Sequence, residues 1–200
     1  MPNTKPFKIA IVGAAGSGKT AAALNLTAHI KSLGLNCEPV LEEARHFIER
    51  CGYPTDVADQ VLIGQGQIQA ENYKSYCDII VCDAAAFLAF VYSIRLKPKN
   101  RASQIRYNYL LSKAWELAYH SLSNYSLVLY APLVYTVKID QVRSWQRLDE
   151  IEGTDQQIAS FLQLHQVPYK TIAGISAKDR LKSMLRAIPP KILKGESHDS

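Results

Sequence analysis

Short apolar runs alternate along the chain with longer stretches in which apolar residues recur every three or four positions. A short apolar run that ends in a turn residue predicts a buried strand, whereas the wider spacing predicts a helix with one buried face. Five runs predict strands, at residues 7–12, 37–41, 79–82, 125–131 and 168–172. The segments between them predict helices, at residues 19–33, 43–51, 55–76, 84–94, 103–122, 156–164 and 177–187.

This alternation predicts an α/β fold. Strands that are apolar throughout are buried on both faces, so we expect a mostly parallel five-stranded sheet with helices on both faces. No repeat or linker interrupts residues 7–188, which predicts a single domain, preceded by a flexible N-terminus at 1–6 and followed by a disordered tail at 189–200. Ligands of such sheets bind at the carboxyl ends of the strands, so the residues that follow the strands are the first candidates for function.

The residues directly after the first predicted strand carry the strongest chemical signal. The sequence GAAGSGKT fits the phosphate-binding pattern G-x-x-x-x-G-K-[ST] in full and lies between a predicted strand and a predicted helix, as that motif requires. Its glycines let successive backbone N–H groups point at phosphate oxygens, and the helix adds its positive N-terminal end. The motif predicts a P-loop NTPase fold and a loop that binds a nucleoside triphosphate, made by Gly13, Ala14, Ala15, Gly16, Ser17, Gly18, Lys19, Thr20 and the following Ala21.

Two residues of this loop and one acid further along predict a catalytic magnesium site. We expect the Lys19 ammonium group to reach the β- and γ-phosphates and the Thr20 hydroxyl to bind Mg²⁺. Asp83 directly follows the third predicted strand, where a carboxylate can hold Mg²⁺ directly or through water. The alternative for Asp83 is an N-cap of the helical segment that follows it.

Charged residues after the second and fourth strands are further candidates. Glu42 can accept the proton of an attacking hydroxyl or bind the hydroxyls of an acceptor sugar, or it can simply begin an acidic first turn of the next helix. Arg45 is either a cation of the acceptor site or a partner in a surface ion pair. Arg143 and Arg147 would lie on one side of a helix, where mobile guanidinium groups can neutralise a transferred phosphoryl group; the alternative is a solvated turn.

Composition limits the class of protein without naming an activity. The 200 residues are 48% hydrophobic and 20% charged, which is typical of a soluble globular protein. No run is long enough to span a membrane and the first residues do not fit a signal peptide, so we expect a cytoplasmic protein without membrane contact. Four cysteines without C-x-x-C spacing are expected to be reduced thiols. The basic stretch at 95–101 contains no aromatic residue, which argues against nucleic acid as a partner.

The order of the motifs resembles the ribosylnicotinamide-kinase-like P-loop family, which comprises the kinase part of bifunctional NAD-biosynthesis regulators and their stand-alone relatives. The resemblance spans roughly residues 7–187 and is carried by GAAGSGKT, LEEARHFIE, IGQGQ, DIIVCDA, IDQVRSWQR and IASFLQLHQVPYKTI. It implies a kinase that uses ATP and Mg²⁺ to phosphorylate a hydroxyl of a nucleoside-like small molecule. It also implies that Glu42 and Arg45 form the acceptor-side E-x-x-R motif, that Gln65 is the glutamine of the middle helix, and that Arg143 is the arginine of a lid.

The sequence departs from this family at two places. The second acid or D-R pair that often follows the strand-three aspartate is replaced by Ala84–Ala86, and the usual lid glycine is Gln141. The first departure leaves a second function open, namely a regulatory ATPase or switch in which ATP and Mg²⁺ order the segments around Asp83 and Arg143 for a protein partner. A third hypothesis, a nucleic-acid-associated ATPase, rests on the basic stretch and on an isoelectric point of about 9.0. The sequence leaves a homo-oligomer open and does not distinguish ATP from GTP.

Overall fold

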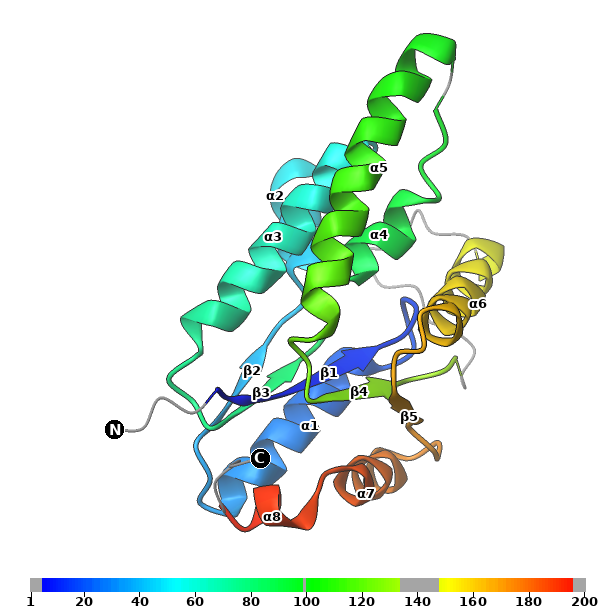
Figure 1. The fold of residues 1–200 in the computed structure, drawn as a ribbon. Helices are drawn as coiled ribbons and strands as arrows, with labels where there is room; N and C mark the ends of the chain where they lie inside the picture. Colours follow the sequence, from blue (N-terminus) through cyan, green and yellow to red (C-terminus); the bar gives the residue numbers. More distant parts are fainter. Residues whose placement is uncertain (1–4, 99, 134–147, 196–200) are drawn as a thin grey trace.

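The chain folds into a parallel sheet flanked by helices, as the alternating pattern predicts (Figure 1). The computed structural model describes residues 5–98, 100–133 and 148–195. The strands are β1 (Phe7–Val12), β2 (Cys37–Val40), β3 (Ile79–Cys82), β4 (Leu127–Tyr130) and β5 (Tyr169–Thr171). The helices are α1 (Lys19–Ser32), α2 (Glu43–Cys51), α3 (Val57–Tyr73), α4 (Leu88–Ser93), α5 (Arg101–Leu122), α6 (Leu148–Leu164), α7 (Ala177–Ala187) and α8 (Pro190–Leu193).

The sheet places the loops after β1 and β3 side by side. The strand order is β2-β3-β1-β4-β5, and every pairing is parallel. The central strand β1 pairs with β3 on one side and with β4 on the other, and all residues of β1 and β3 are buried. The predicted α/β class is therefore confirmed. Because neighbouring parallel strands end at the same edge, the segments that follow β1, β3 and β4 converge there.

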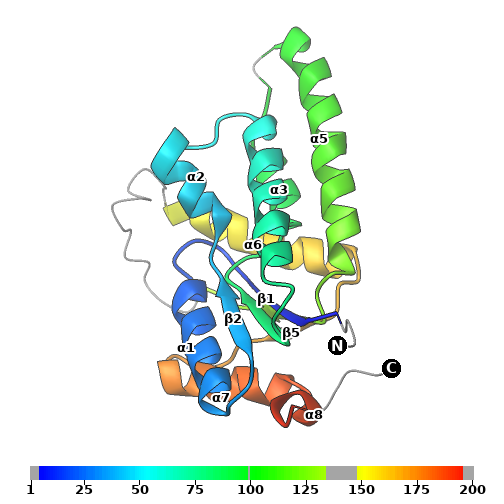
Figure 2. The same ribbon diagram turned by 90° about the vertical axis from the view of Figure 1, so that its left-hand side faces the viewer.

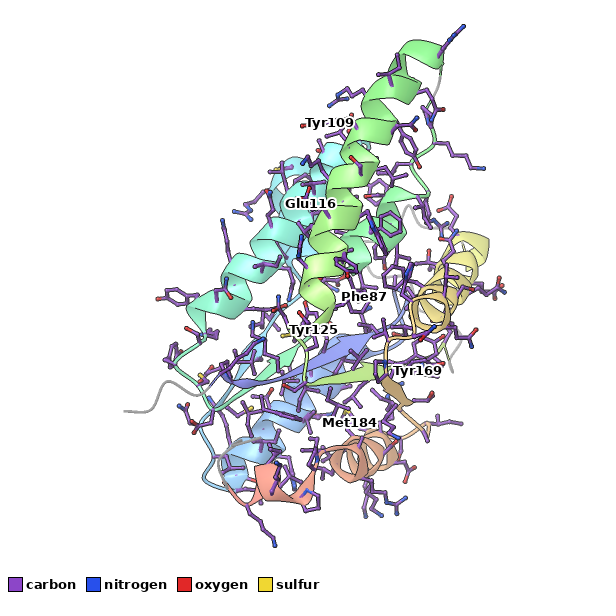
Figure 3. The ribbon with its side chains drawn as sticks, in the orientation of Figure 1. Phe87, Tyr109, Glu116, Tyr125, Tyr169 and Met184 are labelled. Atoms are coloured by element: carbon purple, nitrogen blue, oxygen red, sulfur yellow. The ribbon has the colours of Figure 1, made fainter. Side chains whose placement is uncertain are left out.

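Helices cover both faces of the sheet, and successive residues of β1 pack toward opposite layers. Ile9 and Ile11 belong to the core cluster with α1, α7 and α8, whereas Ala10 and Val12 belong to the cluster with α4, α5 and α6. Figure 2 shows α1, α7 and α8 on one side and α3, α5 and α6 on the other. Figure 3 places Phe87 and Met184 on opposite sides of the sheet. Within the described residues, no helix combines the length and hydrophobicity that a membrane span needs.

Most element boundaries lie within three residues of those that the sequence predicts, and three differ more in extent or in kind. Residues 84–87 are not helical, and α4 begins only at Leu88; α6 begins at Leu148 rather than at residue 156. The sequence predicts a disordered tail from residue 189, whereas the structure forms α8 at Pro190–Leu193. Ile192 is buried in the cluster beside α1 and α7, and burial of this apolar side chain stabilises the segment. The described part of the chain ends at residue 195.

Candidate nucleotide and acceptor site

The loop between β1 and α1 has the wound backbone that phosphate binding requires. Gly16 and Gly18 have φ angles of 77° and 78°, a left-handed conformation that glycine adopts without a steric penalty. A Cβ atom on Gly13 would lie 2.3 Å from the carbonyl oxygen of Ala131, at the end of β4. Gly18 is the N-cap of α1, so the free N–H groups and the positive dipole end of that helix lie at the loop. The loop can therefore hold an anionic group.

Lys19 crosses this loop instead of extending into solvent. Its Nζ donates a hydrogen bond to the carbonyl oxygen of Ala14 at 3.0 Å, and the residue is only 4% exposed. The ammonium group is thus already held at the loop where phosphate oxygens would bind.

Thr20 and Asp83 meet at the edge of the sheet although they lie 63 residues apart. The Thr20 hydroxyl donates a hydrogen bond to Oδ2 of Asp83, a residue that is 1% exposed. Asp83 does not cap the following helix, because α4 begins at Leu88 and its N-cap is Phe87. The structure therefore excludes the N-cap alternative and keeps the carboxylate beside the phosphate loop.

This pair fits one part of a magnesium site. Hydroxyl and carboxylate oxygens are the ligands that Mg²⁺ prefers, and Mg²⁺ commonly takes its other ligands from water and substrate phosphates. Among the described residues no group of three or more His, Cys, Asp or Glu side chains gathers to hold a metal by itself. A metal held by Thr20 and Asp83 would therefore depend on a bound nucleotide.

Two small adjacent pockets lie between α2, α3 and α4, with volumes of about 30 and 40 Å³. Four residues line both pockets: Glu42, Ala44, Gln60 and Tyr92. Glu42 precedes α2 without making a side-chain capping hydrogen bond, and it is 8% exposed. Ala15 of the phosphate loop also lines the second pocket, so Glu42 and the phosphate loop border the same space.

The structure does not bring every predicted acceptor residue to these pockets. Arg45 lies on α2 and Gln65 is exposed on α3, and neither lines either pocket. Gln60, which precedes Gln65 by five residues on the same helix, is the buried glutamine that lines both pockets. Arg143 and Arg147 lie outside the described residues.

Asp155 of α6 hydrogen-bonds to the backbone of the phosphate loop. The sequence pattern did not indicate this residue as part of the site. Its Oδ1 accepts a hydrogen bond from the backbone N–H of Ala14 at 3.4 Å. Its Oδ2 accepts one from the Tyr130 hydroxyl at 2.8 Å and one from the Leu133 N–H at 3.5 Å. Burial and the Asp155 hydrogen bond raise the pKa of Tyr130, so the phenol stays a donor. One carboxylate thus joins the loop after β1 to the end of β4.

Replacing Asp155 by asparagine should weaken triphosphate binding by about tenfold, because one acceptor oxygen becomes an NH₂ group and a charge-assisted hydrogen bond is lost. A titration with a fluorescent ATP analogue measures the effect. Glu152→Gln, on the exposed face of the same helix, is the matched control and should leave the affinity unchanged. Wild-type affinity in both Asp155→Asn and Asp155→Ala would contradict this role.

A second unpredicted residue is Arg180 of α7. It is 5% exposed, and a Cβ atom on Gly18 would lie 3.8 Å from its Nη1, so a buried positive charge lies beside the phosphate loop. The sequence contains one signal for Arg180, namely that this charged residue adjoins a stripe of apolar residues along the predicted helix. The apolar residues of that stripe are Ala177, Leu181, Met184 and Ile188.

The fold and the loop define a P-loop nucleotide-binding protein. A parallel sheet, a glycine-rich loop that leads into a helix, and an acid at the end of the neighbouring strand occur here in the arrangement of that class. The sequence matches the family described as "AAA domain" over residues 8–180. The chain therefore belongs to this family.

Solved structures of nucleotide-binding proteins share the fold. NadR protein in complex with NAD and AMP-PNP has a TM-score of 0.68 and 15% identity, over 91% of this chain and 49% of that chain. NadR protein in complex with NR has a TM-score of 0.68 and 13% identity, over 91% of this chain and 50% of that chain. Deoxyadenosine kinase from M. mycoides with bound dCTP has a TM-score of 0.60 and 13% identity, over 90% of this chain and 97% of that chain. This chain spans about half the length of the NadR chains.

These likenesses bear out the predicted P-loop NTPase fold and the resemblance to the ribosylnicotinamide-kinase-like P-loop proteins. A search of curated proteins found no match to this chain.

Proposed function

We propose that this protein is a phosphotransferase that moves the γ-phosphoryl group of ATP to a hydroxyl of a nucleoside-like small molecule. One observation carries the proposal: Glu42 lines a pocket that also includes Ala15 of the phosphate loop. A hydroxyl that binds at Glu42 would therefore lie beside the terminal phosphate of a nucleotide held by that loop. The folds of NadR and deoxyadenosine kinase support the same class of reaction.

In this proposal each charged residue has one task. Lys19 neutralises the β- and γ-phosphate oxygens, and Thr20 and Asp83 would hold Mg²⁺, which would screen the negative charge of the triphosphate. The acceptor oxygen attacks the γ-phosphorus, the bond to the β,γ-bridging oxygen breaks, and ADP leaves. The hydroxyl proton passes to the Glu42 carboxylate. Arg143 and Arg147 would supply further positive charge to the transferred group.

The acceptor pocket has to open before it can hold a nucleoside. Volumes of about 30 and 40 Å³ are far below the roughly 300 Å³ or more of ordinary small-molecule pockets. Every residue of α2 keeps part of its surface exposed, so this helix is held by less buried contact than the helices around it. We infer that α2 moves outward when the acceptor binds, since low burial characterises the elements that open locally.

The proposal is tested by incubating the purified protein with Mg²⁺-ATP and a panel of nucleosides, ribosylnicotinamide and nucleoside monophosphates. ADP release and product mass are followed together. A phosphorylated product that forms in proportion to ADP supports the kinase and names its acceptor. A complete panel without product, in a protein that binds ATP, would contradict the proposal.

A regulatory ATPase or switch is the second candidate, and the residues after Asp83 favour it. Ala84, Ala85 and Ala86 are all buried and offer no polar side chain to an acceptor. In the same assay this function predicts ADP without a phosphorylated product, or tight ATP binding without turnover. Nucleotide-dependent capture of a protein partner would then identify it.

A further inference from the structure

A buried carboxylate on α3 lies one helical turn from the acceptor pocket. Glu71 is 1% exposed, and its Oε2 lies 3.3 Å from Nζ of Lys8, a β1 residue that is itself 5% exposed. Its Oε1 accepts hydrogen bonds from the Tyr125 hydroxyl at 2.9 Å and from the Gln67 amide at 3.3 Å. A buried charge is strongly destabilising unless it is paired and hydrogen-bonded, and here both oxygens have partners.

Two further hydrogen bonds extend this cluster to the walls of the pocket. The side-chain amide oxygen of Gln67, Oε1, accepts a hydrogen bond from the backbone N–H of Glu43, at the start of α2, at 3.3 Å. The hydroxyl oxygen of Tyr125 accepts from the backbone N–H of Ala86, in the segment after Asp83, at 2.7 Å. Glu43, Gln67 and Ala86 line the same pocket. Figure 3 shows Tyr125 between the end of α5 and the sheet.

The charge on Glu71 sets the direction of these hydrogen bonds. An ionised carboxylate only accepts, so Gln67 turns its NH₂ group and Tyr125 turns its O–H toward Glu71. Their oxygens then face the two backbone N–H groups at the pocket. Burial raises the pKa of Glu71, while the Lys8 ammonium, the strongest opposing influence, favours the ionised form. Burial and the Glu71 charge raise the pKa of Tyr125 well above its usual range, so it remains a donor.

We propose that Glu71 is a positioning residue for phosphoryl transfer, which fixes the two walls of the acceptor pocket through Gln67 and Tyr125. The wall at Glu43 adjoins Glu42, and the wall at Ala86 belongs to the segment that follows Asp83. The cluster therefore sets the distance between Glu42, the proposed base, and Asp83, the proposed metal ligand. The inference rests on the proposed function. It also explains how an all-alanine segment can be placed accurately, because Ala86 is held by its backbone N–H instead of by a polar side chain.

Two variants separate positioning from stability. Tyr125→Phe removes one hydroxyl and keeps both the ring and the Lys8–Glu71 pair. The double variant Lys8→Met with Glu71→Leu removes both buried charges at similar volume, a replacement that is often neutral or stabilising for folding. We expect both variants to fold and to bind ATP with wild-type affinity, while kcat with the acceptor falls roughly 10- to 100-fold. Tyr73→Phe, on an exposed tyrosine of α3, is the control and should match the wild type.

Amide hydrogen exchange gives a readout that does not depend on the acceptor. Exchange at Ala86 should be faster in Tyr125→Phe, and exchange at both Ala86 and Glu43 should be faster in the double variant. Faster exchange with a reduced kcat and an unchanged Kd for ATP supports the proposal. Wild-type kcat in both folded variants, or unchanged protection of Ala86, would overturn it. A wild-type protein that phosphorylates no acceptor would instead overturn the proposed function, and with it the role of Glu71, whatever the exchange data show.

Discussion

Replacing Lys19 by alanine should reduce nucleotide-dependent phosphoryl transfer by about 100-fold or more, while the protein stays folded. Removing one preorganised group that stabilises the transition state has an effect of this size, and here the lost group carries a full charge at the phosphates. The fold should survive because the side chain contacts the carbonyl oxygen of Ala14, within its own loop, and lies outside the core clusters.

Turnover with Mg²⁺-ATP and binding of an ATP analogue are measured together with thermal unfolding. Lys31→Ala is the matched control, since Lys31 lies on the same helix α1 but is exposed and paired with Glu38. The control should keep full activity. A folded Lys19→Ala protein with unchanged turnover would show that the loop after β1 does not hold the phosphates.

Replacing Glu42 by glutamine should abolish phosphorylation of the acceptor and leave the affinity for ATP unchanged. Glutamine keeps the size and the hydrogen-bonding reach of Glu42 but cannot take up the hydroxyl proton at neutral pH. General-base catalysis contributes about 100- to 10,000-fold, so the loss in kcat should fall in that range. Binding of ATP is expected to be spared because Glu42 follows β2, whereas the phosphate loop follows β1.

The measurement compares kcat for the acceptor with Kd for an ATP analogue in the same preparation. Glu49→Gln, an exposed position on α2, controls for a general effect of charge on this helix. Loss of ATP affinity in Glu42→Gln would mean that Glu42 belongs to the nucleotide side. Full activity would remove it from the reaction altogether.

The strands and the phosphate loop were predictable because the signals are local. A short, mostly apolar run such as Phe7–Val12 indicates a buried strand, because its side chains would be unfavourably exposed to water on a surface. The glycines of the loop adopt backbone angles that other residues avoid. The meeting of Thr20 and Asp83 also followed from sequence, since the phosphate loop that leads to Thr20 follows β1 and Asp83 directly follows the neighbouring parallel strand β3. These inferences needed only the order of the residues and the rule that ligands of parallel sheets bind at the carboxyl ends of the strands.

The remaining contacts depend on tertiary packing. Alanine favours helix, yet residues 84–87 are not helical, and the Tyr125 hydroxyl there accepts from the Ala86 N–H. On α3, Leu62 is exposed while the adjacent Ile63 is buried, so hydrophobicity did not show whether Gln60 or Gln65 faces the pocket. Asp155 reaches the phosphate loop from 141 residues away, a distance at which no local pattern carries information.

The small pockets beside Glu42 also bear on the rate at which an acceptor can associate. If the protein is the kinase proposed above, a nucleoside would have to enter a site whose two pockets measure only about 30 and 40 Å³, and α2 would have to move before or during its binding. Under the proposed function, the association rate of the acceptor would therefore depend on how often α2 moves outward. The phosphate loop, whose backbone is already wound, needs no comparable rearrangement before a triphosphate can bind.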